Sequence, residues 1–399
     1  MLDLIKRIVS FGPRLPGSDA DRRTTELISS ELHAYGRSTD LEEIRVRPAW
    51  QLTNALHAAL AAGGTLLSST TSEPLGMLIL LLVAVSTYGD LTARFYILRF
   101  LMPRRRTHNV TSAQPRPDSA ARVILTANHD APRSGLLWVR RRRTGQPRRR
   151  PRRLLASLAG PVDVFFWTVM AAVVAAFASL GLGESDALTV VQFVLAAVLL
   201  TYVMLFVDAA ISDVSPGAST NASGVAALLE VGRRLQERAP RSIETWLVFP
   251  GAKEGLALGM RAWLKEHGDE IDPRDTFFVN VDTIGQGDVH HVTADGYALV
   301  FRSDQRLVRL CEELGSQPHV WRIGTDATQA SMAGFPSVTV CCLDAHGRLP
   351  EFHRTTDTPE RIELDAVERA TDVVEGVVRR IDDLYAPRDA EEAEEAERT

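Results

Sequence analysis

Two long apolar stretches stand close together in the middle of the chain. Residues 160–182 and 187–211 hold almost no charged side chains, and only the short polar link GESD separates them. Each stretch is long enough to cross the roughly 30 Å hydrocarbon core of a bilayer, because a helix rises about 1.5 Å per residue. The pattern therefore predicts a transmembrane helical hairpin over residues 160–211.

A second and weaker hairpin is predicted earlier in the chain. Residues 52–69 form an apolar stretch that carries His57, and residues 75–89 form a more strongly apolar one that ends before Asp90. The link TTSEP between them is again short, and we assign this transmembrane hairpin to residues 51–102. The alternative is that both hairpins are buried core helices of a soluble protein.

The rest of the chain alternates between amphipathic segments and short apolar runs. Helical spacing predicts helices over residues 24–36, 221–239 and 364–385, and apolar runs predict strands within residues 121–130, 244–255, 275–285 and 334–343. Strands that alternate with helices favour a mainly parallel sheet covered on both faces. We therefore predict one discontinuous α/β domain, followed by an acidic tail. The domain comprises residues 1–50, 103–159 and 212–387, and the tail comprises residues 388–399.

Arginines flank the predicted hairpins on one side. They are Arg94, Arg99, residues 104–106 and a dense run within residues 140–153. The positive-inside rule then places the hairpin bases and the α/β domain in the cytoplasm. The net charge of −5 and the lack of aromatic residues within the arginine run argue against a nucleic-acid partner. We expect a multi-pass protein of the cell membrane whose soluble domain is cytoplasmic.

Cysteine content and the N-terminal segment agree with that placement. Three cysteines cannot form a disulfide framework, which favours a reducing compartment. The first residues, MLDLIKRIVSFGPRLPG, lack the long apolar core of a signal peptide, so we expect none.

Polar motifs follow the predicted strands and precede the predicted helices. In chain order they are RLPGSDADRR, HNVTSAQPRPDSAARVILTANHDA, SPGASTNASGVAALLEVGRRL, LVFPGAKEGLALGMRAWL, FFVNVDTIGQG, GTDATQASMAGFPSVTV and EFHRTTDTPERI. Together and in this order they resemble metallopeptidase family 28, the co-catalytic zinc aminopeptidases and carboxypeptidases. The resemblance covers nearly all of the chain outside the hairpins. It implies an α/β fold with the mainly parallel, helix-flanked sheet of zinc exopeptidases.

The resemblance also implies a site. Members of this family hold two zinc ions at the carboxyl edge of the sheet, share one bridging aspartate between them, and use a glutamate as general base. By position, Glu254, Asp282 and His353 retain metal-ligand positions of that centre. Asp130 and Asp357 match positions that support the ligands from behind.

Three other positions of the centre are substituted. Asn128 stands where the family has a ligand histidine, and Thr220 stands where it has the bridging aspartate. Lys253 stands at the position of the general base, and its ammonium could pair with Glu254 and Asp282 in place of a metal. One zinc would keep Asp282 alone, and the other would lose the bridge. We therefore expect none or one zinc ion rather than two.

Some alternatives would restore an active site. His129, next to Asn128, could reach the cleft through a bulge, although on a regular strand it points to the opposite face. Lys253 could lose its proton through burial and serve as the base. A single metal ion held by Glu254 and His353, with or without Asp282, also stays open.

The sequence thus predicts a membrane-anchored protein with a peptidase fold that is catalytically inactive and acts by binding or scaffolding. Its expected partners are the lipid bilayer and a peptide ligand or membrane protein. The alternative is an active membrane-bound, zinc-dependent aminopeptidase with an altered metal centre, so enzymatic activity stays open. A transporter is disfavoured because Asp90 and Arg94 lie at a hairpin end.

Asp326 matches a family loop that often helps form the substrate site, and it could equally cap a helix.

Overall fold

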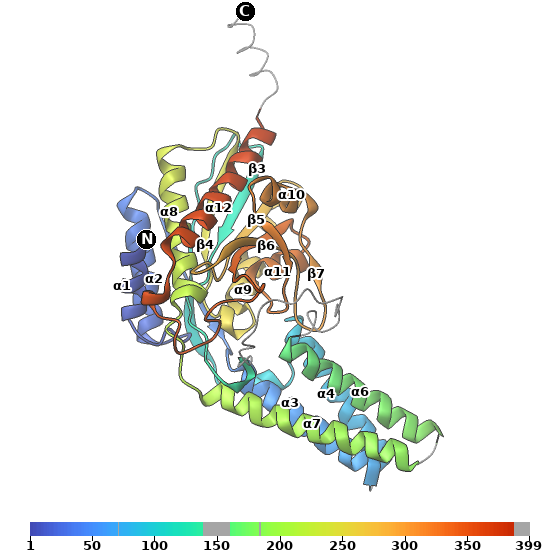
Figure 1. Cartoon of the computed structure of the whole chain (residues 1–399). Helices are drawn as coiled ribbons and strands as arrows, with labels where there is room; N and C mark the ends of the chain where they lie inside the picture. The colour runs from blue at the N-terminus through green and yellow to red at the C-terminus, as the bar shows by residue number, and fades with distance from the viewer. Residues whose placement is uncertain (71, 139–159, 183–184, 387–399) are drawn as a thin grey trace, which may run out of the picture.

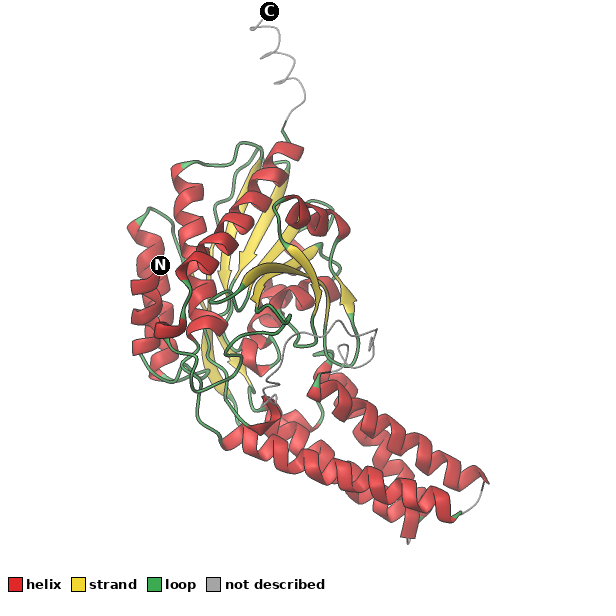
Figure 2. Cartoon of the chain, viewed as in Figure 1, coloured by secondary structure: helices red, strands yellow, loops and turns green. Residues whose placement is uncertain are grey.

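The chain folds into an α/β domain from which a long helical bundle projects (Figure 1). The structure is a computed structural model that describes residues 1–70, 72–138, 160–182 and 185–386. Colouring by secondary structure separates the two parts clearly, because all strands lie in one and the other is entirely helical (Figure 2). The arginine run within residues 140–153 and the acidic tail at 388–399 lie outside the described residues.

Four parallel strands form the centre of the sheet. In spatial order they are β4 (Ile243–Phe249), β3 (Ala121–Thr126), β5 (Thr276–Val281) and β9 (Ser337–Leu343). Nearly every residue of these strands is buried. Because both faces of the sheet are covered, each strand is mostly apolar on both sides rather than alternating between apolar and polar residues. All four predicted strands are confirmed.

Antiparallel strands extend the sheet at both edges. Beyond β4 lie β2 (Arg105–Ser112) and β1 (Asp40–Val46), and beyond β9 lie β6 (Asp288–Asp295) and β7 (Phe301–Arg302), with β8 (Gln317–Val320) parallel to β6. The predicted parallel arrangement therefore describes the centre of a nine-stranded mixed sheet within the described residues. The edge strands are partly exposed and rich in polar residues, so no continuous apolar run marks them.

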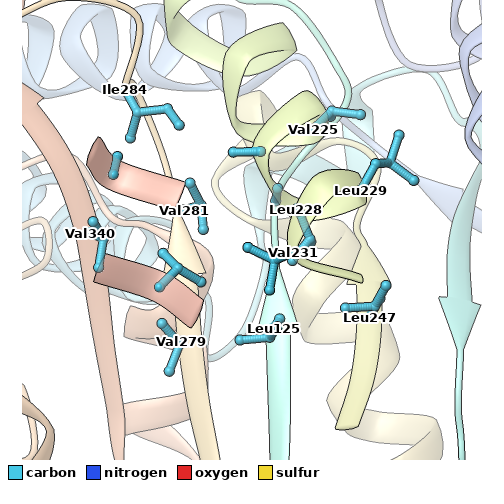
Figure 3. Close-up of a cluster of buried hydrophobic side chains, with 14 of the residues drawn as sticks. Leu125, Val225, Leu228, Leu229, Val231, Leu247, Val279, Val281, Ile284 and Val340 are labelled. Atoms are coloured by element: carbon cyan, nitrogen blue, oxygen red, sulfur yellow. The ribbon is translucent and has the colours of Figure 1, made fainter. Parts of the chain in front are cut away.

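Helices cover the two faces of the sheet. One face carries α1 (Leu2–Ser10), α2 (Asp19–Ala34), α8 (Ser223–Glu237), α10 (Gln305–Glu313) and α12 (Leu364–Leu384), and the other carries α9 (Leu258–His267) and α11 (Asp326–Met332). Figure 3 shows Val225 and Leu228 of α8 against Leu125, Val279 and Leu247 of the strands. The three predicted helices are confirmed as α2, α8 and α12. The first starts earlier than predicted, because the Ser18 hydroxyl accepts a hydrogen bond from the Asp21 amide at 3.1 Å.

Short helices occupy the loops. They are η1 (Leu98–Leu101), η2 (Leu136–Trp138), the π-turn η3 (Ala218–Ala222), η4 (Lys253–Gly255), η5 (Gly268–Glu270) and η6 (Pro359–Arg361).

The projecting bundle is made of the two predicted hairpins. Its helices are α3 (Trp50–Thr70), α4 (Glu73–Leu91), α6 (Pro161–Leu182) and α7 (Asp186–Ile211). Residues 73–91, 161–181 and 186–211 are each long and apolar enough to cross a membrane, and α3 is not among these candidates. The polar side chains of α3 face the bundle interior, where His57 Nε2 lies 2.7 Å from Ser86 Oγ of α4. The pairing of helices in each hairpin is as predicted.

Candidate functional site

Three central strands bring the candidate residues to one edge of the sheet. Asp130 follows the end of β3, Lys253 and Glu254 follow β4, and Asp282 comes directly after β5. Because these strands are parallel, their carboxyl ends meet at the same edge, where α/β proteins place their ligands. His353 joins them from the long loop between β9 and α12, at a positive φ of 55°.

Lys253 lies at the centre of this group. Its Nζ is 3.0 Å from Asp282 Oδ2 and 3.1 Å from Glu254 Oε1, and the side chain is only 5% exposed. Burial opposes the positive charge, but Asp282 and Glu254 together raise the pKa of Lys253 well above its ordinary value. The ammonium is therefore retained, and it pairs with two carboxylates at once.

His353 completes the cluster from the other side. Its Nε2 lies 3.3 Å from Glu254 Oε2, so Glu254 stands between the histidine and Lys253. The imidazole stacks on Phe352 with ring centroids 3.9 Å apart and meets the Trp138 ring at 4.5 Å. Burial and the nearby Lys253 charge lower the pKa of His353 well below its ordinary value, which keeps the ring neutral.

Asp130 fixes the turn that carries Lys253 and Glu254. Its two carboxylate oxygens accept hydrogen bonds from the Lys253 and Glu254 amides, each at 3.0 Å. Asn128 donates its side-chain amide to the Asp130 carbonyl at 3.1 Å, so the substituted position now supports the turn. Burial, followed by the charge of Glu254, raises the pKa of Asp130 to about 6. The predicted supporting role of Asp130 agrees with these contacts.

Asp357 plays a similar part at the start of α8. Its carboxylate accepts hydrogen bonds from the Ser219 amide at 2.7 Å, the Thr220 amide at 3.1 Å and the Thr220 hydroxyl at 2.9 Å. Burial raises the pKa of Asp357 to about 6, although these hydrogen bonds oppose the shift. The hydroxyl of Thr220 is thus committed to Asp357.

His129 does not take the place of Asn128. Its side chain is fully buried, with Nδ1 3.2 Å from Asp21 Oδ1 and Nε2 3.0 Å from the His108 carbonyl oxygen. These partners belong to α2 and β2. The alternation of side chains along the chain therefore holds beyond β3, and the route through a bulge is not taken.

The pair formed by His129 and Asp21 should make stability depend on pH. Burial opposes the charge of His129, but Asp21 raises its pKa above the ordinary value of 6.5. Burial likewise opposes the charge of Asp21, but His129 lowers its pKa below 3.8. The histidine contribution is complete below pH 6.5 and is lost as pH rises through the folded-state pKa, whereas the aspartate contribution is present above pH 3.8 and is lost below it.

We therefore expect the difference in unfolding free energy between wild type and His129→Gln to be largest between about pH 4 and 6.5. It should shrink toward about pH 9. Denaturant unfolding at a series of pH values measures this difference. A difference that stays constant from pH 5 to pH 9 would contradict the charged pair.

Two further residues interact electrostatically with Lys253: Asp326, whose role the motifs left open, and Tyr297, which they did not mark. Asp326 is the first residue of α11, whose cap is Thr325, and its Oδ1 has no hydrogen-bond partner among the described residues. Burial raises the pKa of Asp326 well above its ordinary value, against the opposing charge of Lys253. Tyr297 is partly buried in the same region, and burial raises its pKa well above the ordinary value against the opposing charge of Lys253. No spacing in the sequence marks Tyr297, because it lies in a loop.

The domain-facing end of the bundle touches this site. Arg99 is fully buried and donates to the Gly255 carbonyl oxygen at 2.8 Å, one residue after Glu254. It also donates to both carboxylate oxygens of Asp90 at the end of α4, at 2.6 and 3.0 Å. The turn that carries Lys253 is thereby joined to a bundle helix.

Comparison with protein families relates the α/β domain to known proteins. Residues 203–378 match the model of peptidase family M28. The resemblance indicated by the motifs is confirmed. Comparison with curated proteins finds no match.

Solved structures share this fold over nearly the whole chain. A Zn-dependent exopeptidase from Parabacteroides distasonis aligns with a TM-score of 0.52 and 15% identity, over 97% of each chain. A glutaminyl cyclase from Bacteroides thetaiotaomicron bound to N-acetylhistamine aligns with a TM-score of 0.52 and 13% identity, over 95% of this chain and 96% of that one. A leucine aminopeptidase precursor from the same species gives 0.52 and 14%, over 95% of each chain. The fold is that of the zinc exopeptidases.

The side chains present do not fit the two-ion centre of an M28 peptidase. Lys253 already pairs with Asp282 and Glu254, the two carboxylates at ligand positions. A zinc ion there would meet a buried positive charge in place of the general base. At the substituted positions Asn128 and Thr220 donate hydrogen bonds to other groups. Among the described residues, no group of three or more His, Cys, Asp or Glu is placed to hold a metal.

Proposed function

We propose that this chain is a membrane-anchored M28-fold protein in which a lysine replaces the catalytic metal centre, and that it acts by binding rather than by hydrolysis. The observation that carries the proposal is the position of Lys253 Nζ between Asp282 and Glu254. One buried ammonium supplies the positive charge that the two carboxylates need. Replacing it by zinc would require moving or deprotonating the lysine.

The side chain at the general-base position does not suit hydrolysis. A general base must accept a proton from the attacking water, and a lysine whose pKa is raised by two carboxylates already holds its own. His353 is neutral and turned toward Glu254, and Asp130 is occupied by the backbone of the turn. None of these groups is placed to replace the lost base.

The bundle supports the anchoring part of the proposal. Three of its helices are long and apolar enough to span a bilayer, and large apolar side chains face outward along them, such as Met204 at 72% and Phe177 at 65% exposure. Such a surface is unstable in water and stable in lipid. Exposed arginines after α4 support a cytoplasmic position for the α/β domain, by the positive-inside rule.

Two buried polar atoms near Lys253 support the binding of a ligand. Asp326 offers an unpaired buried carboxylate oxygen, and the His353 Nδ1 also lacks a hydrogen-bond partner among the described residues. Buried polar atoms of this kind gain most from a ligand that bears matching hydrogen-bond groups. A peptide segment, free or part of another membrane protein, has such groups along its backbone.

Metal analysis and activity assays of the purified full-length protein test this function. We expect fewer than about one zinc ion per chain after purification in zinc-containing buffer. We also expect no hydrolysis of aminoacyl substrates and no cyclisation of N-terminal glutaminyl peptides, the activities named for the similar structures.

Two tightly bound zinc ions per chain would overturn the pseudoenzyme proposal. Aminopeptidase activity that Glu254→Ala abolishes would overturn it as well, and would favour the active exopeptidase with an altered metal centre. Lys265→Ala, at an exposed position of α9, is the matched control for unspecific loss of activity.

A further inference from the structure

Exposed apolar side chains outside the bundle gather where the domain meets it. Six of them form what we call the apolar rim: Phe95, Ile97, Phe100 and Leu101 after α4, and Leu299 and Val300 between β6 and β7. Among the described residues outside the four bundle helices, the other exposed large hydrophobic side chains are Leu41, Leu136 and Leu384. Chance exposure on a soluble domain would scatter these residues over its surface.

Both segments of the rim are held at the domain-facing ends of bundle helices. The Phe95 ring lies against Gly89 of α4, so closely that a Cβ added at Gly89 would stand 2.3 Å from it. The amide of Ala298, next to Leu299, donates to Asp163 Oδ1 in the first turn of α6 at 2.9 Å. The rim is therefore continuous with the apolar outer surface of the bundle, where Trp167 of α6 is 56% exposed.

The positive charge around the apolar rim indicates which partner covers it. Arg94 precedes the first rim segment and residues 104–106 follow it, and all four of these arginines are exposed. The Arg47 guanidinium also lies over the Phe100 ring, 5.3 Å from its centroid. Apolar side chains bordered by arginines suit the interface of an anionic bilayer, because the rings enter the acyl boundary while the guanidinium groups reach phosphates. A second copy of the chain would instead bring arginine against arginine.

We propose that the apolar rim inserts into the interfacial layer of the bilayer, so that the α/β domain rests directly on the membrane. The inference rests on the proposed anchoring of the bundle and adds a second, peripheral contact to it. Leu299 is two residues from Tyr297, which lies beside Lys253. This contact would bring the Tyr297 loop, and with it the neighbourhood of Lys253, close to the headgroups.

Depth-dependent fluorescence quenching tests the rim. The native cysteines Cys311, Cys341 and Cys342 are all buried, so one added cysteine can be labelled selectively with an environment-sensitive nitrobenzoxadiazole probe. Full-length Phe100→Cys and Leu299→Cys would be reconstituted in phosphatidylcholine–phosphatidylglycerol vesicles. Nitroxide lipids near the headgroup should quench both labels at least about twofold more than nitroxides deep in the acyl chains.

Two further labels separate the rim from the anchor. Leu200→Cys, in the middle of α7, should be quenched best by deep nitroxides. Leu384→Cys, at the end of α12 far from the bundle in Figure 1, should respond only to aqueous iodide. If Leu200 is quenched and the rim labels respond to iodide like Leu384, the rim proposal is wrong and the anchor stands.

Rim labels shielded from both iodide and nitroxide lipids would mean that protein covers the rim, which also overturns the proposal. If the Leu200 label is not quenched by any lipid, the proposed anchor itself fails. Quenching of the rim labels by shallow nitroxides together with deep quenching of Leu200 supports both.

Discussion

Replacing Lys253 by methionine should lower the unfolding free energy by about 3–5 kcal/mol, because it leaves two buried carboxylates without their shared counter-charge. Methionine keeps most of the side-chain volume, so the change tests charge rather than packing. Asp282 is 1% and Glu254 13% exposed at the side chain, and water can screen their repulsion only weakly. Denaturant unfolding followed by tryptophan fluorescence in detergent measures the loss at neutral pH.

The same variant should gain a response to zinc. As they stand, Glu254, Asp282 and His353 are not placed as a metal site. Without the ammonium between them, the two carboxylates are free to close with the imidazole around a Zn²⁺ ion, which such ligands suit. Added zinc should therefore raise the melting temperature of Lys253→Met and leave that of wild type unchanged.

Lys265→Met removes an exposed lysine of α9 and is the matched control, expected within about 0.5 kcal/mol of wild type. Equal losses for the two variants would refute the role of Lys253 as a replacement for metal. Stabilisation of wild type by zinc would also contradict it.

Arg99→Met should destabilise the protein by a similar amount, about 3–5 kcal/mol, because Asp90 would remain as a buried charge without a counter-charge. Arg99 is fully buried, donates to both oxygens of Asp90 and also holds the Gly255 carbonyl. Its loss should therefore loosen the turn that carries Lys253. Hydrogen exchange should become faster at the amides of Gly255 and its neighbours, and thermal unfolding in detergent reports the global loss.

A double-mutant cycle separates the charge pair from the helix contact. Asp90→Asn with Arg99→Met removes both charges, so the double variant should be destabilised by less than the sum of the single variants. The exposed pair of Arg22 and Glu26 on α2 provides the control, and Arg22→Met should cost less than about 1 kcal/mol. Strict additivity of Asp90→Asn and Arg99→Met would show that the two side chains do not act as a pair.

The centre of the sheet and the helical hairpins were predictable because their patterns depend on burial along a single segment. A strand covered on both faces is mostly apolar, and β3, β4, β5 and β9 are buried at nearly every position. The edge strands β1, β2 and β6 combine polar and apolar residues, and only pairing with a neighbour defines them. The edge strands of the sheet are therefore defined by hydrogen bonds to neighbouring strands, which the sequence pattern does not show.

The order of motifs in the sequence identified most residues of the candidate site, but it did not predict which of them contact one another. The motifs placed Asn128, Asp130, Lys253, Glu254 and Asp282 near the carboxyl edge, since parallel strands end together. The spacing of residues in the sequence predicted neither the place of Tyr297 near Lys253 nor the pairing of Asp90 with Arg99. Loops and helix ends bring these residues together, and neither has a regular sequence pattern. Sequence proximity had set Asp90 beside Arg94, whereas the buried partner is Arg99.

What the sequence by itself determined is the identity of the groups: a lysine in place of a general base, a threonine in place of a bridging aspartate, and two apolar hairpins. What only the tertiary structure decided is where the positive charge of that lysine goes. Lys253 Nζ lies between Asp282 and Glu254 because β4 and β5 end on either side of β3, which brings residues distant in sequence within 3.0 Å. Electrostatic pairing depends on distance in space, and that distance is set by the fold.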